Sequence, residues 1–169
     1  MDRREAIKRT ALLTGFAISS STLASLLQGC QPEAKSPLDS WAPKFFTKEQ
    51  GLTLAEIGEC ILPQTDTPGA KEVFVHEFVD LMVADCKMPE DKQQFRDGIT
   101  QLMAGCEQAT GKSFLDCSPE QQLAFLNEQD QAARALVDAN PGLAAEDYPF
   151  FLKLKQLILL GYFTSETVG

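Results

Sequence analysis

Histidine is almost absent from this 169-residue sequence, in which His76 is the only one. A Ser–His–Asp triad or a histidine-containing metal site could therefore be built no more than once. His76 falls inside a predicted helix, between Val75 and Glu77. We expect it to be a surface or partly buried helical residue rather than a general base.

Basic residues are also in short supply, with 15 Lys and Arg against 24 Asp and Glu and a net charge of −9. Binding to the phosphates of nucleic acid needs a basic surface, so nucleic acid is not expected as a partner. The glycine patterns of dinucleotide-binding and phosphate-binding loops are missing, which excludes the standard nucleotide sites. The Cys-x-x-Cys-His pattern that attaches haem c is missing as well. These absences leave no standard cofactor site in the sequence.

No apolar run is long and strong enough to predict a membrane-spanning helix, which needs ~20 such residues. Near the N-terminus, Arg3 and Arg4 precede an uncharged stretch over residues 10–27, which a polar run at 19–22 interrupts. A basic segment followed by a modest apolar stretch predicts a secretory signal over residues 1–29. The paired arginines resemble a twin-arginine signal, and the translocase of that route exports proteins that are already folded.

The signal is followed by a cysteine that resembles a lipid attachment site. The segment Leu26-Leu27-Gln28-Gly29-Cys30 resembles a lipobox, in which Cys30 is lipidated after cleavage. Such an anchor holds a protein at a membrane surface without a spanning helix. Residues 30–44 are rich in proline and small polar residues and predict a flexible tether. The alternative is an ordinary signal peptide with an unmodified Cys30.

Four cysteines remain in the predicted folded part, namely Cys60, Cys86, Cys106 and Cys117. Their wide spacing fits no compact zinc or iron–sulfur pattern. In an oxidising compartment they could form two disulfides, with three conceivable pairings. Cys60 and Cys106 fall on predicted apolar faces and could equally be buried thiols.

Beyond the tether, apolar residues recur with a period near 3.6, and the alternation typical of strands is almost absent. Thr47 with Gln50, and Ser118 with Gln121, form capping boxes that predict helix starts. Gly111 is a predicted C-terminal cap. The sequence predicts an all-α fold, one compact bundle of about five helices within residues 45–169, near 47–63, 70–86, 89–111, 118–140 and 147–160.

The apolar positions of these helices predict the core. The second helix is expected to bury the stripe Phe74, Phe78, Leu81 and Met82. The fourth is expected to bury Leu123, Phe125 and Leu126. The last helix is apolar over a wide arc, which predicts a central position. An acidic cluster is expected to be a solvated face rather than a catalytic pair, namely Asp80, Asp85, Glu90 and Asp91.

Two segments of the sequence carry a family resemblance. Ile61-Leu62-Pro63, followed by Asp66-Thr67-Pro68-Gly69-Ala70, resembles the hallmark of the gluconate 2-dehydrogenase subunit 3 family. Phe150-Phe151 and Leu160-Gly161-Tyr162-Phe163-Thr164-Ser165-Glu166 are similar to the closing segment of that family. The resemblance covers residues 45–169.

The resemblance implies a non-catalytic small subunit of a membrane-associated, GMC-type sugar, alcohol or gluconate dehydrogenase in the periplasm. FAD is then expected on a large partner subunit that lacks an export signal, and haem c on a third, multihaem cytochrome subunit. The small subunit would carry the flavoprotein through the twin-arginine translocase and itself hold no cofactor. The alternative is a stand-alone, lipid-anchored periplasmic protein, either structural or a small redox protein that uses its cysteines and His76.

Such a subunit needs a large apolar interface with its partner. The candidate surface is the loop 63–70 together with the tail 162–166, and in particular Pro68, Gly69, Tyr162 and Phe163. Aromatic residues at a chain end favour an interface. Alternatively, the two aromatic rings pack back on the core of this chain.

Overall fold

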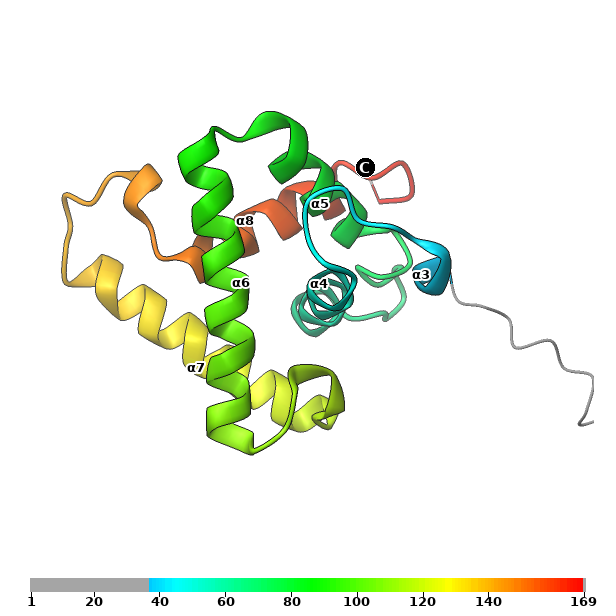
Figure 1. Ribbon diagram of the computed structural model, residues 1–169, viewed down its shortest axis with the longest axis horizontal. Helices are drawn as coiled ribbons and strands as arrows, with labels where there is room; N and C mark the ends of the chain where they lie inside the picture. The colour runs from blue at the N-terminus through cyan, green and yellow to red at the C-terminus, as the bar shows by residue number, and fades with distance from the viewer. Residues whose placement is uncertain (1–36, 169) are drawn as a thin grey trace, which may run out of the picture. The chain divides into compact units, whose positions relative to one another are not determined.

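The computed structural model describes residues 37–168 (Figure 1). The predicted signal residues Arg3 and Arg4 and the predicted lipid site Cys30 lie outside the described residues. The chain divides into two units, and the boundary in the sequence falls between Trp41 and Ala42. Of the first unit, the described part holds one short helix, α3 (Pro37–Ser40).

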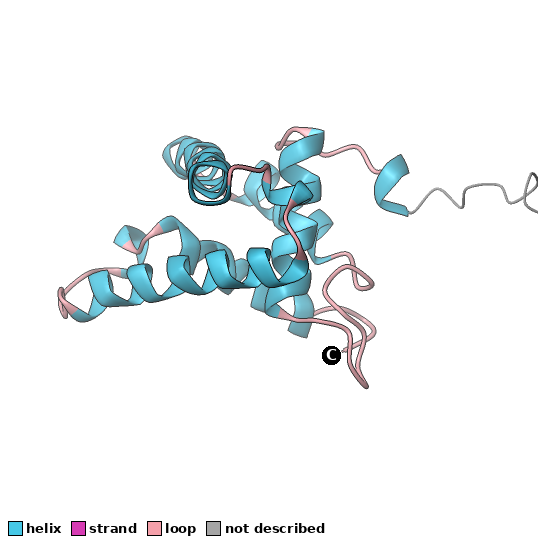
Figure 2. Ribbon diagram, turned by 90° about the horizontal axis from the view of Figure 1, so that it is seen from below, coloured by secondary structure: helices cyan, strands magenta, loops and turns pink. Residues whose placement is uncertain are grey.

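The second unit is built from helices, and residues 37–168 contain no strand (Figure 2). Five α-helices and two short 3₁₀ helices follow one another: α4 (Lys48–Ile61), α5 (Val75–Cys86), α6 (Pro89–Thr110), η1 (Phe114–Asp116), α7 (Pro119–Asp138), η2 (Ala145–Asp147) and α8 (Phe150–Phe163). The predicted all-α bundle is therefore confirmed.

Local hydrogen bonds explain where α4, α6 and α7 begin or end. The Thr47 hydroxyl accepts from the Gln50 N–H at 3.2 Å, while the Gln50 side chain accepts from the Thr47 N–H at 3.0 Å. Ser118 and Gln121 repeat this capping box at the start of α7. Gly111 ends α6 with a φ of 73°, a left-handed conformation that glycine adopts without steric cost. These boundaries agree with the prediction.

The start of α5 differs from the prediction, because the helix begins at Val75 and not near Ala70. The Lys71 N–H donates to the Glu59 carboxylate of α4 at 2.9 Å, so the chain before α5 is bound to α4. Phe74 then takes a left-handed conformation with a φ of 56°. For a residue other than glycine this costs on the order of 1 kcal/mol, which the surrounding contacts must offset.

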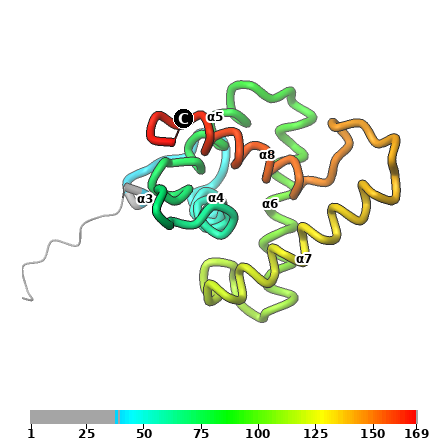
Figure 3. The backbone as a smooth tube through the Cα atoms, turned by 180° about the vertical axis from the view of Figure 1, so that it is seen from behind, coloured from blue at the N-terminus to red at the C-terminus, as the bar shows by residue number. Residues whose placement is uncertain are grey.

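Helix α8 is central, as its wide apolar arc predicted, and it packs against α5, α6 and α7 (Figures 1 and 3). Leu154 and Ile158 are fully buried, and each contributes about 1.5–3 kcal/mol through burial of its side chain. The helix begins at Phe150, three residues later than predicted, because Tyr148 precedes a proline and its ψ of 145° is outside the helical region. It continues to Phe163, beyond the predicted end at Leu160.

The buried face of α5 is not the predicted one. The helix buries Val75, His76, Val79, Asp80 and Val83 instead. Phe74 and Leu81, which were predicted to be in the core, are exposed, and Phe78 is half-buried. On α7, Leu123 is also exposed, whereas Phe125 and Leu126 are buried as predicted. The sequence of α5 carries two apolar stripes, and packing against α4 and α8 selects the valine stripe.

Asp80 departs from the predicted solvated acidic face, whereas Asp85 and Glu90 are exposed as predicted. The Asp80 side chain is buried, and its carboxylate oxygens accept from the backbone N–H groups of Lys44, Phe45 and Phe46 at 2.6, 3.0 and 3.0 Å. A buried carboxylate is stable only where hydrogen bonds replace its hydration. Asp80 therefore fixes the segment that leads into α4.

Candidate partner interface

Contacts with the last turn of α4 fix the loop between α4 and α5. The Glu59 carboxylate accepts from the N–H groups of Gln64 at 3.1 Å and Lys71 at 2.9 Å. The Ala70 N–H donates to the Leu62 carbonyl at 2.9 Å and closes the loop. One glutamate thus holds both ends of the loop, and residues 63–67 are exposed at its tip.

Tyr162 brings the tail of α8 to this loop, although the two segments lie more than 90 residues apart in the sequence. Its hydroxyl donates to the Pro68 carbonyl at 2.8 Å and lies 3.3 Å from the Thr67 hydroxyl. Only 6% of Tyr162 is exposed. The two segments that carry the family resemblance therefore form one surface, with Tyr162 inside it.

Gly69 is buried beneath the same loop. A Cβ atom at this position would come within 2.8 Å of the Gln64 nitrogen and would collide with the Glu59 carboxylate. Glycine is therefore needed for the close approach of the loop to α4. Of the four candidate interface residues, Phe163 alone is exposed, at 61%, and its ring packs edge-on against Tyr162 at 5.3 Å.

Exposed apolar side chains lie on both members of the helix pair formed by α5 and α8. Phe74 and Leu81 belong to the α5 side, and Leu160 and Phe163 to the α8 side. We call these four residues the α5–α8 apolar residues. Between the two helices, Phe78 packs on Gly161 so closely that a Cβ there would come within 2.6 Å of the ring. The exposure of Phe74 and Leu81 was not predicted, because the apolar periodicity of α5 placed both residues in the core.

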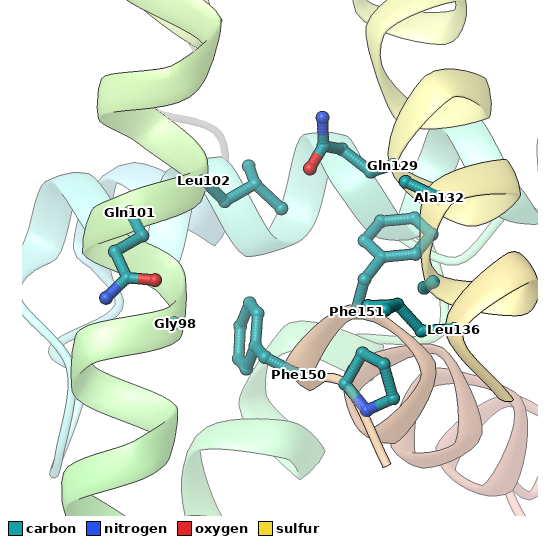
Figure 4. A pocket seen from close by; sticks show the side chains of 10 residues that line it. Gly98, Gln101, Leu102, Gln129, Ala132, Leu136, Phe150 and Phe151 are labelled. Carbon is teal, nitrogen blue, oxygen red and sulfur yellow. The ribbon is translucent and has the colours of Figure 1, made fainter. Parts of the chain in front are cut away.

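A hollow of about 370 Å³ lies between α6, α7 and α8 (Figure 4). Figure 4 shows the rings of Phe150 and Phe151 turned into it, with the amide side chains of Gln101 and Gln129 at its edge. The side chains that line it are apolar or carry amides, so it offers apolar contact and no titratable group.

His76 is more deeply buried than the sequence suggested, with 2% of the residue exposed. Burial lowers its pKa to about 4, and the positive charges of Lys48 and Lys71 act in the same direction against the opposing charge of Asp80. The imidazole is therefore neutral at neutral pH. The ring therefore lies inside the fold and not on its surface.

The four cysteines of the folded unit are thiols in this structure, which contains no disulfide among residues 37–168. Cys106 and Cys117 lie together, with 3.8 Å between their sulfur atoms. Cys60 is half-buried beside Gln122, and Cys86 is exposed at the end of α5. Burial is the main cause that raises the pKa of Cys60 and of Cys106.

Within the described part of the chain, no three His, Cys, Asp or Glu side chains gather into a metal-binding group. Over the same residues, 37–168, none of the helices has the length and apolar character that crossing a membrane requires.

Residues 48–169 match the family described as Gluconate 2-dehydrogenase subunit 3. No curated protein and no solved structure matches the chain. The family match spans every helix from α4 to α8 and includes both segments that Tyr162 joins. The chain therefore belongs to the gluconate 2-dehydrogenase subunit 3 family.

Proposed function

We propose that this chain is the non-catalytic small subunit of a periplasmic, flavin-dependent dehydrogenase of the GMC type, which oxidises a sugar, an alcohol or gluconate. In this role it stabilises the large subunit, which holds FAD, and escorts it through the twin-arginine translocase. A multihaem cytochrome c is the proposed third subunit. The observation that carries the proposal is the set of α5–α8 apolar residues in a chain that belongs to this family.

The exposure of these side chains is what a partner surface requires. Large exposed apolar residues that gather on neighbouring elements favour a protein interface over bulk solvent. Phe163 is the largest of the exposed ones on α8, and aromatic residues commonly dominate binding energy. Tyr162 supports the same surface from beneath, because its bond to Pro68 fixes the loop next to the end of α8.

The fixed geometry of this region favours a preformed binding surface. Glu59 holds both ends of the loop, Gly69 allows its close approach to α4, and Tyr162 joins it to α8. A rigid surface loses little conformational entropy when a partner binds. We therefore place the large subunit on the α5–α8 apolar residues and the adjoining loop tip at 63–67.

Co-purification with the flavoprotein tests the interface. The double variant Leu160→Ser/Phe163→Ser is co-expressed with the large subunit and purified through a tag on this chain. We expect the flavin absorbance of the purified material to be at least tenfold lower than with the unaltered chain. Leu123→Ser/Leu136→Ser is the matched control on α7, and Leu123 and Leu160 are equally exposed at 47%. Equal flavin recovery from both variants contradicts the interface. Tyr162 stays unchanged, because its removal would perturb the fold.

The export role has its own test. Arg3→Lys/Arg4→Lys is expected to retain both this chain and the flavoprotein in the cytoplasm, whereas Arg9→Lys leaves export intact. Normal export of the flavoprotein with the paired arginines replaced contradicts the escort role.

Lipidation of Cys30 is also part of the proposal. Cys30→Ser is expected to release the complex from the membrane fraction into the soluble periplasmic fraction. Cys86→Ser, which alters an exposed cysteine of the folded unit, serves as the control. Unchanged membrane association of Cys30→Ser contradicts the anchor.

A further inference from the structure

We propose that Cys106 and Cys117 are a modification site, at which exchange with a disulfide-bearing oxidant closes one intramolecular disulfide in the folded protein. This choice selects one pair among the four cysteines of the folded unit and leaves Cys60 and Cys86 as thiols. It rests on the proposed export to the periplasm only for the source of the oxidant.

The two sulfur atoms are already in contact. They lie 3.8 Å apart, and both side chains are buried. A disulfide brings sulfur atoms to about 2.05 Å, so the bond needs an approach of roughly 1.8 Å. No other pair of cysteine sulfurs among the described residues is in contact, because the Cys60 thiol faces Gln122 and Cys86 is exposed on α5.

The segment between the two cysteines is held so that they face each other. Cys106 lies one turn before the end of α6, and Gly111 turns the chain back with its left-handed conformation. The Ser113 side chain caps η1, and the Phe114 carbonyl accepts from the Gln122 side chain at 2.8 Å. The contact is thus part of the fold and needs no rearrangement of a helix.

Exposure sets the order of the two exchange steps. Cys106 is wholly buried, whereas Cys117 retains 7% of its surface, so the thiolate of Cys117 attacks the disulfide of the oxidant first. This step forms a mixed disulfide and releases one thiolate of the oxidant. The Cys106 thiolate then attacks the Cys117 sulfur and displaces the second thiolate.

The exchange balances in electrons and protons. The two cysteines lose two electrons and two protons in all, and the disulfide of the oxidant takes them up to become two thiols. The oxidant is a thiol–disulfide oxidoreductase in its disulfide form, or oxidised glutathione in the test tube. The Thr110 hydroxyl lies beside both sulfur atoms, 3.3 Å from that of Cys117 and 3.9 Å from that of Cys106.

Peptide mapping of the purified chain tests the pairing directly. Trypsin cleaves after Arg96, Lys112 and Arg134, so the two cysteines fall on the separate peptides 97–112 and 113–134. After incubation with oxidised glutathione and blocking of the remaining thiols, we expect these two peptides to appear cross-linked. The thiol count should fall by two per chain. Tm should rise by about 10 °C, because the bond closes a loop and thereby lowers the conformational entropy of the unfolded chain.

Matched variants separate this site from the other cysteines. Cys106→Ser and Cys117→Ser are each expected to lose the cross-linked pair, whereas Cys60→Ser and Cys86→Ser keep it. If a buried variant does not fold, the thiol count and peptide map of the unaltered chain decide. Four unreacted thiols in the folded unit after oxidation, or a cross-link that involves Cys60 or Cys86, overturn the assignment.

The outcome is independent of the proposed export. A cross-link in the purified chain supports the site even if Arg3→Lys/Arg4→Lys leaves the cellular location unchanged, a result that contradicts only the escort role. Conversely, normal export of a chain whose two thiols never pair refutes the disulfide and leaves the proposed function intact.

Discussion

The single buried histidine makes the stability of this protein depend on pH in a way that one residue controls. The unfolded chain binds a proton on His76 near its ordinary pKa of 6.5, whereas the folded chain holds that pKa at about 4. Between these values the unfolded state binds more protons. The stability that the neutral His76 contributes is therefore fully present above pH 6.5 and is lost as the pH falls towards 4.

The size of the effect follows from the same two values. At 1.36 kcal/mol per pH unit, the full loss is about 3 kcal/mol, and about 2 kcal/mol of it occurs between pH 8 and pH 5. Most carboxylates titrate below pH 5, and the chain has no other histidine. The window from pH 8 to pH 5 thus isolates His76.

Urea unfolding followed by circular dichroism at 222 nm is the appropriate assay, because urea does not screen charges. Fluorescence would report on Trp41, the only tryptophan, which lies in the other unit. We expect the free energy of unfolding to fall by about 2 kcal/mol from pH 8 to pH 5 in the unaltered protein. In His76→Phe, which cannot titrate, this dependence should vanish.

Two results would refute this reasoning. One is a change of less than about 0.5 kcal/mol over the window in the unaltered protein. The other is an equal pH dependence in His76→Phe. If the variant fails to fold, an NMR titration of the one imidazole in the unaltered protein measures its pKa directly, and a value near 6.5 refutes the prediction.

Three further substitutions test single contacts by urea unfolding. Tyr162→Phe should cost about 1 kcal/mol, because it removes one hydrogen-bond donor and keeps the ring, and no loss would show that this bond is not formed. Asp80→Ala should cost about 3 kcal/mol, since three backbone N–H groups lose their acceptor, and a cost below about 1 kcal/mol would contradict its anchoring role. The pKa of Asp130 is lowered, because burial, which alone would raise it, is outweighed by hydrogen bonds from Lys155 and Arg134. The stability that the ionised Asp130 contributes is therefore present above its ordinary pKa of 3.8 and is lost as the pH falls below that value. Asp130→Asn should abolish that acid-induced loss, and a loss of equal size in the variant would contradict it.

The parts of the fold that sequence predicted are those that neighbouring residues control. The start of α4 depends on Thr47 and Gln50, three residues apart, and the end of α6 depends on the freedom of Gly111. These signals act within one helical turn, so no knowledge of the tertiary structure is needed to use them.

The start of α5 was not predictable in this way. The helical pattern continues back to Ala70, but Glu59 of α4 binds the Lys71 N–H and Phe74 turns left-handed. The contact that replaces helix at these residues thus comes from Glu59 of α4, and no pattern of neighbouring residues predicts it.

The candidate interface shows the same division. The sequence singled out both the loop around Pro68 and the aromatic pair Tyr162 and Phe163, but left open whether the rings face inward or outward. The structure divides the pair, with Tyr162 bound to the loop and Phe163 in solvent. Their positions on a helix differ by about 100°, so neighbours in sequence face different surroundings.

By itself, the sequence determined the helical class, the caps that begin α4 and α7 and end α6, the central place of the last helix and the family. Only the tertiary structure decided which stripe of α5 is buried, that Asp80 and His76 lie inside, and that Cys106 meets Cys117. The physical reason is that caps and periodicity depend on residues that are close in the sequence, whereas burial depends on which surface a neighbouring helix covers. When a helix such as α5 offers two apolar faces, only its packing partners choose between them.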